Sequence, residues 1–140
     1  MPTKLDSAAA LEDQSSEERP HVLVVDDDHE MAHSLKLALE REGYRASVAG
    51  DGNQGLAIAE AKRPDMIILD IMMPRRSGFL VLERLRQELD DPVPVIILTG
   101  NMGDRHRAYA EMLGVVGYFY KPVKFPQLID TINDLLDDDA

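Results

Sequence analysis

Short runs of consecutive apolar residues, rich in β-branched side chains, recur along the chain, and each ends abruptly at a polar residue. These runs are Val22–Val25, Met66–Leu69 and Val95–Leu98. A strand with one solvated face alternates apolar and polar residues, whereas a strand buried on both faces is apolar throughout. The runs therefore predict central strands of a parallel sheet that is covered by helices on both faces.

Segments with helical periodicity separate these runs. Met31, Leu35 and Leu39 lie on one face of a helix, and Gly43 suits the left-handed position that ends it. The same reasoning predicts shorter strands over 46–49 and 118–120 and helices over 53–62, 78–89, 104–113 and up to about 136. Alternating strands and helices require right-handed crossovers, so we expect an α/β fold: a doubly wound, five-stranded parallel sheet with five helices.

Composition narrows the classes of function. The net charge of −11 repels phosphate backbones and anionic lipid, so we expect no direct binding to nucleic acid or to a membrane. The absence of cysteine excludes thiolate nucleophiles and cysteine-ligated metals. With neither a signal peptide nor a long apolar segment in the sequence, we expect a cytoplasmic protein.

The chain has room for one domain of ordinary size. Residues 1–20 are mostly Ala, Ser, Glu and Asp and are expected to form a flexible N-terminal tail. Residues 21–137 hold the predicted strands and helices, and residues 138–140 form an acidic C-terminal end. Any function of the folded part must therefore reside in the domain over 21–137.

Polar residues stand at the predicted carboxyl ends of the strands, where open α/β sheets bind ligands. They are Asp26 to Asp28, Asp70, Thr99 and Lys121. Carboxylates gathered at the end of a buried sheet repel one another unless a cation lies between them, and Mg²⁺ suits such a site. A carboxylate neutralised in this way can attack phosphorus, while a lysine and a threonine stabilise phosphoryl oxygens.

Motifs at four of these strand ends occur in a familiar order. They are Val24-Val25-Asp26-Asp27, Leu69-Asp70-Ile71-Met72-Met73-Pro74 with Gly78, Leu98-Thr99-Gly100, and Lys121-Pro122. With these motifs, the chain from about His21 to Leu136 resembles the receiver domain of bacterial response regulators, of the chemotaxis type, in two-component signal transduction. The resemblance implies a flavodoxin-like three-layer sandwich with strand order 2-1-3-4-5.

The resemblance also implies a metal site and a phosphorylation site. Asp26, Asp27, Asp70 and the backbone carbonyl of Met72 would bind Mg²⁺. Asp70 would be the phosphoacceptor, taking a phosphoryl group from a phosphohistidine on a sensor histidine kinase or phosphotransfer protein. The chain would then catalyse only its own phosphoryl transfer and autodephosphorylation, and it would not be an enzyme acting on a separate substrate.

Three further residues match the family's switch. Lys121 and Thr99 would contact the phosphoryl group, and Thr99 would move toward it while Tyr118 rotates inward. This change would reshape the face of the fourth helix, fifth strand and fifth helix, which would bind a downstream effector protein or a second copy of the chain. An aromatic residue in a short strand is more often simple core packing, so Tyr118 is the weakest of these assignments.

The residue two positions after the phosphoacceptor tunes dephosphorylation in similar domains, as does the second residue after the threonine, here Asn101. We hypothesise that the apolar side chain of Met72 positions water poorly and lengthens the life of the phosphoryl group.

Other functions are compatible with parts of the pattern. A flavodoxin-like electron carrier would need a loop that accepts the FMN phosphate, and Asp26 to Asp28 would repel it. An aspartyl-phosphate phosphatase would carry a second acid where Met72 stands. An unphosphorylated interaction module, or a receiver fragment of a larger regulator or hybrid kinase, stays open. His29 and His33 are spaced for a metal, but we expect surface positions for them.

Overall fold

The computed structural model describes residues 19–73, 77–88, 93–100 and 103–136. Its centre is a five-stranded sheet in the order β2-β1-β3-β4-β5, and all neighbouring strands are parallel. The strands are β1 (His21–Val25), β2 (Arg45–Ala49), β3 (Met66–Leu69), β4 (Val95–Thr99) and β5 (Gly117–Tyr120). Both the predicted strand order and the predicted parallel pairing are confirmed.

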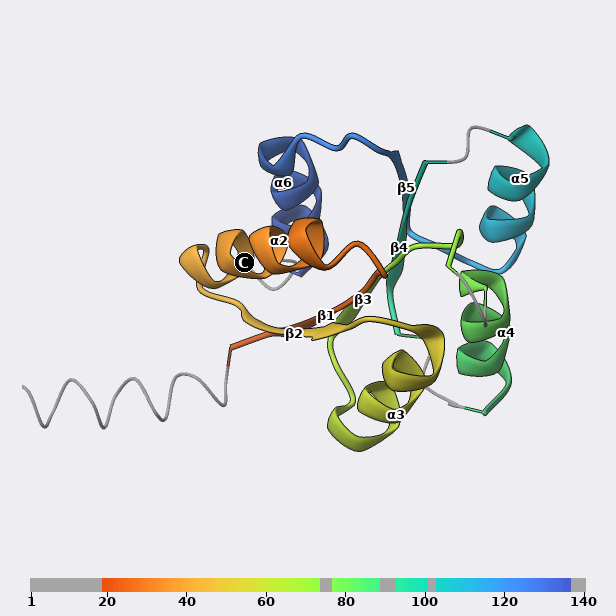
Figure 1. Cartoon of the computed structure of the whole chain (residues 1–140), viewed down its shortest axis with the longest axis horizontal. Helices are drawn as coiled ribbons and strands as arrows, with labels where there is room; N and C mark the ends of the chain where they lie inside the picture. Colours follow the sequence, from red (N-terminus) through yellow and green to blue (C-terminus); the bar gives the residue numbers. More distant parts are fainter. Residues whose placement is uncertain (1–18, 74–76, 89–92, 101–102, 137–140) are drawn as a thin grey trace, which may run out of the picture.

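Helices connect the strands and cover both faces of the sheet. They are α2 (His29–Arg41), α3 (Gly52–Lys62), α4 (Gly78–Glu88), α5 (Asp104–Met112) and α6 (Phe125–Leu136). Helices α2 and α6 lie on one side of the sheet, and α3, α4 and α5 lie on the other (Figure 1). The structure therefore has the three layers that the alternation of strands and helices predicted.

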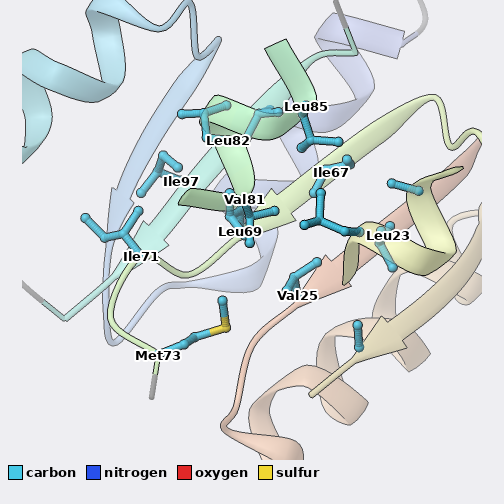
Figure 2. Packing of buried hydrophobic residues seen from close by; sticks show 14 of the residues in the cluster. Leu23, Val25, Ile67, Leu69, Ile71, Met73, Val81, Leu82, Leu85 and Ile97 are labelled. Carbon is cyan, nitrogen blue, oxygen red and sulfur yellow. The ribbon is translucent and has the colours of Figure 1, made fainter. Parts of the chain in front are cut away.

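Two hydrophobic clusters fill the spaces between these layers. Successive strand side chains point to opposite faces, so Val22 and Val24 join the cluster under α2 and α6, whereas Leu23 and Val25 join the cluster under α3 and α4. Figure 2 shows this second cluster, in which Leu82 and Leu85 of α4 pack over β3 and β4. Burial on both faces explains why each central strand holds an unbroken run of four apolar residues.

The first turns of two helices are closed by aspartates. Asp28 accepts a hydrogen bond from the backbone N–H of Met31 at 3.2 Å, and Asp51 accepts one from Gln54 at 2.8 Å. Such caps satisfy backbone donors that a helix leaves unpaired. Asp28, which follows β1, therefore serves as the N-cap residue of α2.

Some predicted features lie outside the described residues. These are residues 1–18 of the expected tail, Leu89 at the expected end of its helix, Asn101, and the acidic end at 138–140. Arg19 and Pro20 are described, and their carbonyls accept hydrogen bonds from the Arg45 side chain and backbone. Across the described part of the chain, none of the helices is long and apolar enough to cross a membrane.

Candidate functional site

Three aspartates meet at the carboxyl end of the sheet. Strands β1 and β3 end in register, because Val25 pairs with Leu69, and this register places Asp26 beside Asp70. One carboxylate oxygen each from Asp26, Asp27 and Asp70 lies within 4.8 Å of the others. Asp26 and Asp70 are buried and Asp27 is half-buried, so the cluster is a concentrated negative charge with little access to water.

Backbone groups hold two of these carboxylates in place. The N–H of Asp28 donates to Asp26 Oδ1 and the N–H of Met72 donates to Asp70 Oδ1, each at 2.9 Å. The N–H of Asp70 donates to the carbonyl of Val25, which continues the ladder between β1 and β3 past the last paired residues. The carboxylates are therefore fixed by the sheet and by the turns that follow it.

Lys121 supplies the positive charge of the cluster. Its Nζ lies 2.8 Å from Asp26 Oδ2 and 3.2 Å from Asp70 Oδ2. The backbone N–H of Lys121 donates to the carbonyl of Thr99 at 2.8 Å, and this bond joins the ends of β5 and β4. The structure thus brings the predicted lysine onto the predicted carboxylates.

Burial and ion pairing both shift the pKa values of Asp26 and Lys121. Burial raises the pKa of Asp26 to about 6, although the hydrogen bonds from Lys121 and Asp28 act in the opposite direction. Burial alone would lower the pKa of Lys121, but its contacts with Asp26 and Asp70 outweigh burial and raise that pKa. One ammonium group therefore does not fully compensate for the carboxylates around it.

These donors fit a hard divalent cation. Oδ2 of Asp26 is buried and, despite its ion pair with Lys121, accepts no hydrogen bond of good geometry among the described residues. Mg²⁺ prefers carboxylate oxygens together with water and phosphate oxygens. Among the described residues, the three aspartates are also the only set of three or more acidic, histidine or cysteine side chains placed to share an ion.

The structure also gives the positions of the other predicted residues. Thr99 ends β4 and is fully buried. Met72 follows β3 and its side chain is 54% exposed, while its N–H contacts Asp70 as described above. The role of the Met72 carbonyl as a ligand stays a prediction. His29 and His33 are both exposed, as expected.

Tyr118 lies on β5, opposite Ile97 of β4, and does not contact the carboxylates in any described interaction. Its half-buried ring packs against the cluster under α3 and α4, and its hydroxyl group is buried. Burial raises the pKa of this hydroxyl above the ordinary value for tyrosine. The ring thus contributes to packing, and its role as a switch stays a prediction.

Gly78 has a role at the site that sequence reasoning did not identify. A Cβ atom at Gly78 would lie 2.3 Å from the carbonyl oxygen of Asp70 and 2.7 Å from the Cα atom of Ile71. Only glycine therefore allows the start of α4 to approach the backbone of the proposed phosphoacceptor so closely. The sequence showed a glycine at a familiar spacing, but the close approach itself is visible only in three dimensions.

Comparison with known proteins agrees with this geometry. Residues 22–133 match the family described as the response regulator receiver domain. The chain is 36% identical over 115 residues to the probable transcriptional regulatory protein TcrX of Mycobacterium tuberculosis, a match that covers 82% of the chain and 49% of TcrX. It is also 36% identical to the transcriptional regulatory protein AfsQ1 of Streptomyces coelicolor, covering 75% of the chain and 46% of AfsQ1.

Solved structures show the same fold. A CheY-like receiver domain protein of Methanospirillum hungatei superposes with a TM-score of 0.81 at 29% identity, covering 86% of this chain and 95% of that one. The receiver domain of the Francisella response regulator 1452 gives a TM-score of 0.80 at 32% identity, covering 87% and 100%.

The chain belongs to the response regulator receiver domain family of two-component signal transduction. Receiver domains of this family are phosphorylation switches that bind Mg²⁺ at an acidic pocket and interact with histidine kinases. The chain spans about half the length of the curated relatives that it matches.

Proposed function

We propose that this chain accepts a phosphoryl group on Asp70 from a phosphohistidine, in a reaction that depends on Mg²⁺. The observation that carries the proposal is the contact of one half-buried lysine, Lys121, with two buried carboxylates, Asp26 and Asp70, at the carboxyl end of the sheet. A structural salt bridge would need only one of these acids, and the other would add an uncompensated charge.

The residues proposed to hold Mg²⁺ are Asp26, Asp27 and Asp70, together with the carbonyl of Met72. When bound, the ion supplies positive charge that offsets the negative charge of a phosphoryl group during transfer. Asp26 and Asp70 are already positioned by hydrogen bonds from the backbone, so little reorganisation of the protein is needed for binding.

In the proposed transfer, an oxygen of the Asp70 carboxylate attacks phosphorus. A P–O bond forms, the P–N bond of the phosphohistidine breaks, and its electron pair returns to the imidazole nitrogen. Lys121 Nζ lies 3.2 Å from Asp70 Oδ2. The ammonium group is therefore close enough to neutralise an oxygen of a phosphoryl group bound to Asp70. The hydroxyl group of Thr99 is proposed to donate to another phosphoryl oxygen.

The proposed output follows from the position of Lys121 and Thr99 at the ends of adjacent strands. A shift of Thr99 toward the phosphoryl group would change the space available to Tyr118 on β5. We propose that this change alters the surface formed by α5, β5 and α6, where an effector protein or a second copy of the chain binds. The phosphoryl donor is proposed to be a sensor histidine kinase or a phosphotransfer protein.

A comparison of two neighbouring aspartates tests the proposal. Asp27→Asn removes a proposed ligand of the ion, whereas Asp28→Asn is a matched control because asparagine also caps a helix. With acetyl phosphate as donor, we expect Asp27→Asn to lose at least tenfold in the initial rate of phosphorylation at low millimolar Mg²⁺. We expect Asp28→Asn to stay within about twofold of the wild type. Equal rates for both variants would contradict the proposed metal site.

The alternative of an unphosphorylated interaction module makes a different prediction. It requires no Mg²⁺ dependence and no covalent change at Asp70. The paired Asp26, Asp70 and Lys121 favour the phosphorylation switch over this alternative.

A further inference from the structure

Arg107 lies against the proposed switch residue. It is on α5, and its guanidinium carbon lies 5.5 Å from the centre of the Tyr118 ring. A guanidinium group at this distance over an aromatic face is attracted to the ring. Arg107 thus joins α5 to β5 at Tyr118.

Arg107 also contacts a neighbouring acid of its own helix. Its Nε donates to Glu111 Oε1 at 3.0 Å, one helical turn further along α5. The rings of Tyr118 and Tyr120 meet edge to face, with their centres 5.4 Å apart. The Tyr118 ring therefore contacts an arginine and a second tyrosine in addition to the core.

Two effects of opposite sign act on the packed position of the Tyr118 side chain. Its ring packs against the core, which favours the packed position. Its hydroxyl group is buried, and no described residue is its hydrogen-bond partner, which opposes the same position. A side chain held between such opposing effects can be shifted by a modest interaction.

The other residues of α5 make few buried contacts that would fix the helix against β5. Ala110 is fully buried, and the other α5 residues whose burial is described are half-buried or exposed. The N-cap residue, Gly103, offers no side-chain hydrogen bond to the first turn. Near the other end of α5, Arg86 of α4 donates to the carbonyl of Leu113 at 2.9 Å. The contact between Arg107 and Tyr118 therefore lies between a well-anchored end of the helix and a weakly capped one.

We propose that Arg107 is a positioning residue for Tyr118, and that its contact with the ring sets the balance between the packed and the outward positions of the switch. This inference rests on the proposed function, in which Tyr118 responds to phosphorylation, and adds the residue that biases the response. Exposed cation–π contacts contribute roughly 0.5–1 kcal/mol. Loss of the contact should thus lower the ratio of packed to outward Tyr118 by about two- to fivefold, because 1.4 kcal/mol corresponds to a tenfold change.

Fluorine NMR on protein labelled with 3-fluorotyrosine measures this ratio directly. The chain has four tyrosines, and Tyr118→Phe identifies the resonance of Tyr118. The difference in chemical shift between H₂O and D₂O reports the exposure of the ring. The variants are Arg107→Ala, Arg107→Lys, which keeps the charge without the planar group, and Arg105→Ala, which changes an exposed arginine of the same helix.

We expect Arg107→Ala to expose the Tyr118 ring in the unphosphorylated protein, Arg107→Lys to give an intermediate result, and Arg105→Ala to match the wild type. An unchanged Tyr118 resonance in Arg107→Ala would overturn the proposal, as would an equal change in Arg105→Ala. Melting curves show whether each variant is folded, and the 48% exposure of the Arg107 side chain indicates that both Arg107 variants will be. Addition of acetyl phosphate and Mg²⁺ then tests the proposed function separately. A Tyr118 resonance that does not respond in the wild type would contradict the switch, whereas the effect of Arg107 is judged before phosphorylation.

Discussion

Replacement of Asp26 by asparagine should stabilise the protein in the absence of divalent cations. Burial holds the pKa of Asp26 near 6, whereas an unfolded aspartate ionises near its ordinary value of 3.8. Between these values the unfolded chain releases a proton that the folded chain keeps, so stability falls as pH rises from about 4 to about 6. The loss then persists at higher pH.

The size of the effect follows from the difference between the two pKa values. About two units correspond to roughly 3 kcal/mol at pH 7.5. Asparagine has almost the same shape as aspartate, and its carbonyl oxygen can still accept the hydrogen bond from the Asp28 N–H. We therefore expect Asp26→Asn to raise the free energy of unfolding by about 2–3 kcal/mol at pH 7.5.

Urea unfolding followed by circular dichroism, with a chelator present, measures this difference. The gain should shrink to near zero below pH 4, where the wild-type carboxyl group is protonated in both states. Millimolar Mg²⁺ should stabilise the wild type more than the variant, because a ligand of the folded state shifts the unfolding equilibrium. A variant less stable than the wild type at pH 7.5, or a gain that is unchanged at pH 4, would refute the reasoning.

Other parts of the structure give further predictions. Burial, followed by the charges of nearby cations, lowers the pKa of His21, so stability should fall as pH drops below about 6.5. Substitution by glutamine, which can keep a hydrogen bond to Ser47, should weaken that pH dependence in urea titrations, and an unchanged slope would count against it. Gly78→Ala should cost about 1–3 kcal/mol and slow phosphorylation, because the new Cβ atom collides with the Asp70 carbonyl; wild-type stability and rate would contradict this. Met72→Asn should shorten the lifetime of the phosphoryl group severalfold in a phosphate-release assay, and an unaltered lifetime would refute the hypothesis about Met72.

Most of the fold could be predicted from the sequence because its three central strands, β1, β3 and β4, are buried on both faces. That burial requires continuous apolar runs, and such runs are easily told from amphipathic helices. The first strand begins at His21, one residue before its apolar run, and the second begins at Arg45. Backbone pairing extends each strand past the apolar residues, and side-chain patterns do not reveal it.

The acidic cluster could also be predicted, because the ends of parallel strands converge at one edge of the sheet. Asp26, Asp70 and Lys121 are brought together as expected. The contacts of Gly78 and Arg107 could not be predicted. They depend on how closely α4 approaches β3 and on how α5 lies against β5, and neither distance follows from local sequence.

The most direct test of the central claim is the intact mass of the protein after incubation with acetyl phosphate, with and without Mg²⁺. The wild type should gain the mass of one phosphoryl group only when Mg²⁺ is present, and Asp70→Asn should gain none. A wild type that stays unmodified under these conditions and with a phosphohistidine donor, or an Asp70→Asn variant that gains the same mass, would contradict the assignment of Asp70 as the phosphoacceptor.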